Sequence, residues 1–125
     1  MLKLAALLLV LAPALAHADK DFQAADGGTH DCAEDPVVNI SQGTGAFTIT
    51  GECTEINVNG DKLKVTIANT KALHLNGSSN TVVVTEVGEI LINGTKNKVS
   101  WKKATSGKRP STTVNGKGNA VAKAK

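Results

Sequence analysis

A seventeen-residue repeat between residues 56 and 101 constrains the fold more than any other feature of the sequence. The run Ile56–Gly60 recurs as Leu73–Gly77 and again as Ile90–Gly94, each time with apolar first and third residues followed by Asn-Gly. A second alternating run of apolar and polar residues follows each glycine. A fixed period of this length is typical of repeat architectures, so each unit should form one supersecondary element that stacks on its neighbours.

Apolar and polar residues alternate within each unit, which predicts strands that bury one face. Aligned units place like side chains in columns, as in a parallel β-solenoid whose coils lie about 4.8 Å apart. We therefore predict an all-β, short parallel β-solenoid of about five coils. The first unit is one residue longer than seventeen, and five residues are inserted between Lys102 and Pro110. The predicted inward columns are Val38, Ile56, Leu73 and Ile90; Ile40, Val58, Leu75, Ile92 and Val114; Phe47, Val65, Val82, Val99 and Val121; and Ile49, Ile67, Val84 and Trp101.

The turn carries a glycine in every unit after the first, which has Gln42 there, and in the later units an asparagine follows three residues on. Glycine accepts the positive φ that tight turns require, and stacked asparagines can hydrogen-bond to one another and to the next turn. Asn-Gly between alternating runs would also suit an antiparallel β-meander or small barrel, which is the alternative fold. A meander, however, gives no reason for both strands and the asparagines to recur in one register. The turn glycines are Gly60, Gly77, Gly94 and Gly116, and the asparagine column is Asn80, Asn97 and Asn119.

Residues 1–18 have the pattern of a cleaved secretory signal peptide. Lys3 precedes an apolar run that ends at Leu15, and Ala16-His17-Ala18 supplies small residues around a cleavage point after Ala18. The apolar run is too short for the ~20 residues that a transmembrane helix needs. We therefore predict a periplasmic or secreted protein that is not transmembrane after signal removal.

Cys32 and Cys53 are the only cysteines. In an exported chain a single pair this close in sequence favours a structural disulfide, and the spacing lacks the Cys-x-x-Cys pattern of redox and zinc sites. Closing such a loop would add roughly 3 kcal/mol of stability.

The repeats divide the mature chain into three parts. Residues 19–36 are polar and acidic without periodicity, and we expect a loop or cap that Cys32 tethers. Residues 37–122 form the single β-repeat domain, and residues 123–125 are expected to be a frayed tail.

The tandem pattern apolar-x-apolar-Asn-Gly-x-x-Asn-x-Val-x-Val, behind a signal peptide and a cysteine pair, resembles a family of bacterial exported proteins known as domain of unknown function 3060. The resemblance covers roughly Cys32 to Val121. It implies a bacterial envelope or secreted location. It carries no activity and no catalytic residue to transfer.

The repeats contain no evident set of catalytic residues. The polysaccharide-cleaving β-helices need clustered carboxylates, and the predicted outward columns hold none. His74 is the only histidine of the repeats and has no evident acidic or cysteine partner in the sequence. His30 lies near Asp26, Asp31 and Glu34, which would allow weak metal binding at most. We predict a non-enzymatic protein without cofactor, catalytic residue or dedicated metal site.

Charge is the functional signal that remains. Residues 19–55 carry eight acidic residues and one basic residue, whereas no acidic residue follows Glu89 and nine basic residues do. In a solenoid, order along the sequence is order along the axis, so the charges should form a gradient from end to end. We predict that the basic C-terminal coils bind an anionic envelope partner: a lipid headgroup, lipopolysaccharide or an acidic polymer. The candidate anion-binding residues are Lys96, Lys98, Lys102, Lys103, Lys108, Arg109 and Lys117.

Two other interpretations of the charge remain open. Acidic and basic ends of two molecules could meet, which would give a head-to-tail, self-associating structural module with no specific ligand. Alternatively, the lysines could only keep the edges of a β-protein soluble. Nucleic acid is not expected, because the chain is exported and lacks interleaved aromatic residues.

Overall fold

The computed structural model describes residues 19–22, 25–41 and 43–125, and in these residues all regular structure is strand. The predicted signal peptide, residues 1–18, lies outside the described residues. The strands are β1 (Lys20–Phe22), β2 (Ala25–Asp31), β3 (Val37–Ile40), β4 (Gly43–Asn59), β5 (Lys64–Ser78), β6 (Thr81–Thr95), β7 (Lys98–Ala104), β8 (Ser111–Asn115) and β9 (Ala120–Lys123).

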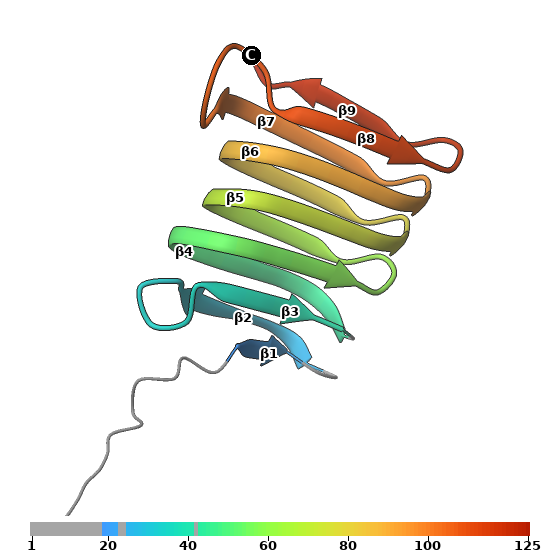
Figure 1. The fold of residues 1–125 in the computed structure, drawn as a ribbon. Coiled ribbons are helices and arrows are strands. Elements are labelled where there is room, and N and C mark those ends of the chain that lie inside the picture. Colours follow the sequence, from blue (N-terminus) through green and yellow to red (C-terminus); the bar gives the residue numbers. More distant parts are fainter. Residues whose placement is uncertain (1–18, 23–24, 42) are drawn as a thin grey trace, which may run out of the picture.

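The strands stack in sequence order into a parallel β-solenoid (Figure 1). β4, β5 and β6 each run along one side, bend, and return on the other side. Lys64 pairs with Thr81 and Ser78 pairs with Thr95, so the seventeen-residue offset holds from end to end of β5. Every strand pair is parallel. The predicted solenoid is confirmed, and the antiparallel meander is excluded.

The solenoid has two broad faces and two edges. Face A is the outer surface of β2, β7, β9 and the N-terminal halves of β4 to β6. Face B is the outer surface of β1, β3, β8 and the C-terminal halves of β4 to β6. The turn edge holds the turns at residues 60–63, 77–80, 94–97 and 116–119, and the bend edge is the opposite side, where β4 to β6 bend (Figure 1).

The core lies between face A and face B and consists almost wholly of aliphatic side chains. Each buried position in β5 has a buried partner seventeen residues away in β6, as Leu75 has in Ile92. Stacking of like side chains at the spacing of the coils removes both from water without a change of shape between layers. Val114 keeps the register of its predicted column, since it pairs with Ile92, but it is 42% exposed at the C-terminal end of the stack.

The turn edge is held by buried asparagines. The side-chain oxygen of Asn97 accepts hydrogen bonds from the backbone nitrogen of Asn80 (3.0 Å) and from its Nδ2 (3.1 Å), and Nδ2 of Asn97 donates to the Gly77 carbonyl oxygen (3.0 Å). Asn119 repeats this arrangement one coil further on. A side chain at Gly94 would overlap the Gly77 carbonyl oxygen, so the stacking of the turns requires glycine there.

We expected a loop or cap at residues 19–36 because this acidic segment lacks periodicity. The structure shows strands there instead. β1 and β2 form a further coil in parallel register with β3 and β4. Its inward positions carry Phe22, Gly28 and His30 rather than aliphatic residues, which hides the strand pattern. The Phe22 ring fills the space beside Gly28, where an added Cβ would lie 2.7 Å from Phe22 Cε1.

Cys32 and Cys53 form the predicted disulfide, which joins the segment after β2 to the bend of β4. Both cysteines are buried. The bridge closes 21 residues of sequence separation and is consistent with an oxidising compartment.

Two irregularities of the repeat have clear positions. The extra residue of the first unit lies at the bend of β4, between Ile49 and Glu52, where the register to β5 shifts. The five inserted residues fall between Ala104 and Ser111. Lys123, which the pattern assigned to the tail, belongs to β9, and the Ala124 nitrogen donates to the Trp101 carbonyl oxygen (2.6 Å).

Candidate anion-binding surface

The seven candidate anion-binding residues lie around the last coils on three sides of the solenoid, and we call them the basic collar. Lys96 and Lys117 stack at the turn edge, where the Lys96 nitrogen donates to the Lys117 carbonyl oxygen (3.0 Å). Lys98 and Lys102 are exposed on face A. The rest of the collar is Lys103 at the bend edge and Lys108 and Arg109 in the loop between β7 and β8.

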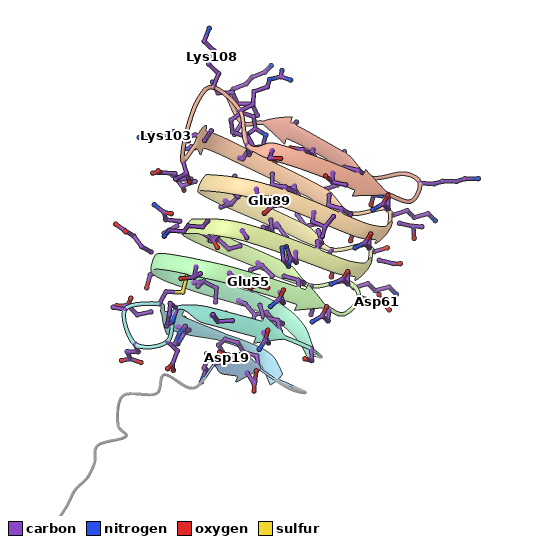
Figure 2. The ribbon with its side chains drawn as sticks, viewed as in Figure 1. Asp19, Glu55, Asp61, Glu89, Lys103 and Lys108 are labelled. Carbon is purple, nitrogen blue, oxygen red and sulfur yellow. A yellow bond between two sulfur atoms is a disulfide. The ribbon has the colours of Figure 1, made fainter. Side chains whose placement is uncertain are left out.

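Face B differs from the other three sides in its charge. Glu55, Ala72 and Glu89 form one column on it, and apart from Lys20 its strand segments contain no lysine or arginine. Figure 2 shows Glu55 and Glu89 on this face, with Lys103 at the bend edge. The structure therefore gathers the candidate residues in the last coils of the axis but leaves face B of these coils without them.

The acidic and basic residues are separated along the axis. Asp19 lies at one end of the stack and Lys108 at the other (Figure 2). Because the coils follow sequence order, the fold keeps these groups apart by the height of the whole stack. A rod with such a charge distribution is attracted to an anionic surface by one end and repelled at the other.

A hollow of about 410 Å³ opens at the C-terminal end of the solenoid, inside the coil formed by β8 and β9. Sequence patterns did not predict it, because residues from three separate segments form its walls. The one sequence feature that marks this hollow is the insertion after Ala104, because it contains two of the lining residues. The lining residues are Trp101, Arg109, Pro110, Thr112, Val121 and Lys123.

A second hollow of about 340 Å³ lies at the bend edge beside the disulfide. Its walls include Glu52, Lys71 and Glu86, so charges of both signs face it. In the lining of the hollow at the C-terminal end, all charged residues are basic. Only the latter matches the charge of the basic collar.

His74 has an acidic partner that the sequence did not reveal. Its Nδ1 lies 3.2 Å from Oε2 of Glu55, and both side chains are partly exposed, at 29% and 36%. Glu55 lies nineteen residues earlier, and the seventeen-residue coil brings it diagonally beside His74 on face B. The expectation that His74 lacks an acidic partner was wrong, although Asn57 and Leu91, which pair with His74 on the neighbouring strands, supply no nucleophile.

His30 is buried rather than free in an acidic loop. Its Nε2 donates to the Asp35 carbonyl oxygen (2.9 Å), and Asp31 accepts a hydrogen bond from the Ala33 nitrogen (2.9 Å). Among the described residues, no group of three or more histidine, cysteine or acidic side chains is arranged to hold a metal ion.

Within residues 19–22, 25–41 and 43–125, the structure contains no helix long and apolar enough to cross a membrane.

Comparison with known proteins agrees with the resemblance inferred from the repeats. The model of a family described as "Protein of unknown function (DUF3060)" matches residues 42–82, which span β4, β5 and the start of β6. No curated protein and no solved structure matches the chain significantly.

Proposed function

We propose that this protein is an exported, non-enzymatic binding module whose basic C-terminal coils attach it to an anionic component of the cell envelope. The partner would be a lipid headgroup, lipopolysaccharide or an acidic polymer. The observation that carries the proposal is the position of the basic collar at the axial end opposite the acidic coil.

The scaffold suits such a role because it holds charged side chains at fixed spacings. Lys98, for example, projects from a strand whose neighbours Val99 and Trp101 are buried. A rigid array loses less conformational entropy on binding than a mobile polybasic tail would. The charge difference between the ends would orient the rod with its last coils toward the anionic surface.

Co-sedimentation with anionic liposomes and with lipopolysaccharide across a salt series tests the proposal. We expect binding at low salt that weakens steeply as salt rises, because exposed charges are screened within about 10 Å at 0.1 M salt. A chain that fails to sediment with either partner at low salt would refute the proposal.

The repeat supplies a matched pair of variants for this experiment. Lys62 and Lys64 occupy the same coil positions as Lys96 and Lys98, thirty-four residues earlier. The Lys96→Gln/Lys98→Gln variant should bind about thirtyfold more weakly, since each of the two lysines contributes about 1 kcal/mol near an anionic surface. The Lys62→Gln/Lys64→Gln control has the same net charge and should bind nearly as the wild type does. Equal losses in both variants would mean that net charge alone matters.

Head-to-tail self-association is the second candidate. Among the described strands, β8 pairs only with β6 and β9 only with β7, so the last coil has free strand edges, which favour pairing with another chain. Sedimentation velocity at two salt concentrations distinguishes the candidates. A monomer that binds liposomes supports attachment, whereas salt-sensitive oligomers without liposome binding support self-association.

A further inference from the structure

The C-terminal end of the solenoid is an unfinished core. In the coil below, Ile90 and Ile92 are fully buried, whereas Thr112 and Val114, which continue their columns in β8, are exposed. Nothing in the described chain covers Val114 or the half-buried Val121 of β9 from above. The interior between face A and face B is therefore open at this end.

The hollow of about 410 Å³ in this opening, which we call the end pocket, has an apolar base and a basic rim. Trp101, 7% exposed, lies in the base, with Val121 and the buried Pro110 beside it. Arg109 and Lys123 supply the charge. The volume lies within the range of roughly 300–1,000 Å³ that is usual for small-molecule pockets.

Lys123 occupies an unusual position for a lysine. It pairs with Trp101 and so continues the column of Ile49, Ile67 and Val84. Its Nζ lies 5.8 Å from the centroid of the Trp101 ring. A cation is thus placed over the apolar base of the pocket, where it can meet the charged end of a molecule whose apolar part lies on the indole.

We propose that the end pocket binds an anionic amphiphile, namely an acyl chain that carries a carboxylate or phosphate. The apolar base would cover part of the chain, and Arg109 and Lys123 would pair with the headgroup. Acidic residues are absent from the lining, so the headgroup meets no repulsion there. This inference rests on the proposed function and deepens it, because it selects lipid-like ligands among the anionic partners and assigns them a site.

Trp101 makes the binding directly measurable. It is the only tryptophan, and the chain contains no tyrosine, so emission excited at the indole band comes from the end pocket alone. A ligand that enters the pocket displaces Lys123 or water from the ring and changes the emission of Trp101.

The experiment titrates the chain without residues 1–18 with four probes below their micelle concentrations: octanoate, octyl phosphate, octanol and acetate. We expect saturable shifts in Trp101 emission with octanoate, octyl phosphate or both, and the tighter of the two identifies the headgroup. Octanol lacks the charge and acetate lacks the chain. Each should therefore bind at least about tenfold more weakly than the tighter of the two anionic amphiphiles. Octanol binding as tight as that of octanoate, or no saturable shift with either anionic amphiphile, would overturn the inference.

Two neighbouring residues of one loop provide the matched variants. Arg109 lines the pocket and Lys108 does not, and both are exposed. Arg109→Gln should weaken binding of the anionic amphiphile about tenfold, as loss of a charge-assisted hydrogen bond does, whereas Lys108→Gln should leave it unchanged. Unchanged binding in Arg109→Gln would count against the proposed headgroup contact and overturn the inference.

Two further outcomes separate this inference from its alternatives. Trp101 emission that depends on protein concentration, together with a doubled mass in sedimentation, would mean that a second copy covers the end, and would overturn the inference. Liposome binding that persists while octanoate and octyl phosphate leave Trp101 unchanged would refute the end pocket as a lipid site but not the proposed function.

Discussion

The two ends of this solenoid are built from the same repeat, yet one is closed and the other is open. At the N-terminal end, the Phe22 ring packs edge-on against Phe47, with centroids 5.1 Å apart, and is only 8% exposed. At the C-terminal end, all five residues of β8 are exposed. The comparison shows that a repeat unit cannot bury its own apolar face, so a terminal coil needs side chains that the repeat itself does not supply.

Each end also places a lysine near an aromatic ring, with different results. Nζ of Lys20 lies 4.9 Å from the Phe22 centroid, but the ring itself already covers the core. Lys123 lies over Trp101 in a coil that leaves the core open. The N-terminal aromatic residue therefore acts as a lid, and the C-terminal one acts as the base of a pocket.

Removal of the Phe22 lid should have the largest effect on the free energy of unfolding. Phe22→Ala should destabilise the protein by about 4 kcal/mol, because it removes a buried aromatic side chain and leaves a cavity over Phe47. Val114→Ala at the open end should cost less than about 0.5 kcal/mol, since Val114 is 42% exposed. Urea unfolding followed by circular dichroism measures both values. Similar losses in the two variants would contradict the described difference between the ends.

Loss of the disulfide at the closed end should have the second-largest effect on stability. Cys32→Ser/Cys53→Ser should cost about 3 kcal/mol, because the bridge limits the entropy of the unfolded chain over 21 residues of separation. Hydrogen exchange should locate the loss in β1 to β4, while protection in β6 stays at its wild-type value. Uniform loss of protection along the axis would mean that the coils unfold as one cooperative unit.

Closing the open end should stabilise it slightly. Lys123→Leu places an apolar side chain over Trp101 and removes a charge from an inward column, which should add about 1 kcal/mol. The urea midpoint measures this change, and Lys125→Leu is a control beyond β9. A lower midpoint in Lys123→Leu would mean that the contact between Lys123 and Trp101 contributes more than the burial gained.

The smallest effects should come from the hydrogen-bond ladders on face B. Asp21 accepts a hydrogen bond from Asn39 Nδ2 at one end (2.9 Å), and Asn115 Nδ2 donates to Asn93 at the other (2.8 Å). Both bonds are exposed, so Asp21→Ala and Asn115→Ala should each cost about 0.5 kcal/mol, with Asp21→Ala the larger because its acceptor is charged. Thermal unfolding at matched ionic strength compares them. A cost above about 2 kcal/mol for either would show that the outer ladder supports the end coils.

Sequence reasoning failed where a coil departs from aliphatic inward residues. Gly28 and His30 hide the strand pattern of β2, since the first leaves room for Phe22 and the second satisfies its buried ring through the Asp35 carbonyl oxygen. The Glu55–His74 pair was missed for another reason. Its members are separated by one coil and two strand positions, and that spacing has meaning only once the register is known.

The sequence by itself determined the coil. Alternation at period two and recurrence at seventeen residues were sufficient for the solenoid and for its inward columns apart from Val114, and the single close pair of cysteines was sufficient for the disulfide. Tertiary structure decided what happens at the ends and around the circumference. Whether Phe22 closes a core, whether Lys123 lies over Trp101 and which sides carry the basic collar depend on contacts between residues of different coils. A repeat specifies how one coil lies on the next, but the last coil has no neighbour, so its exposed core is set by packing that no period encodes.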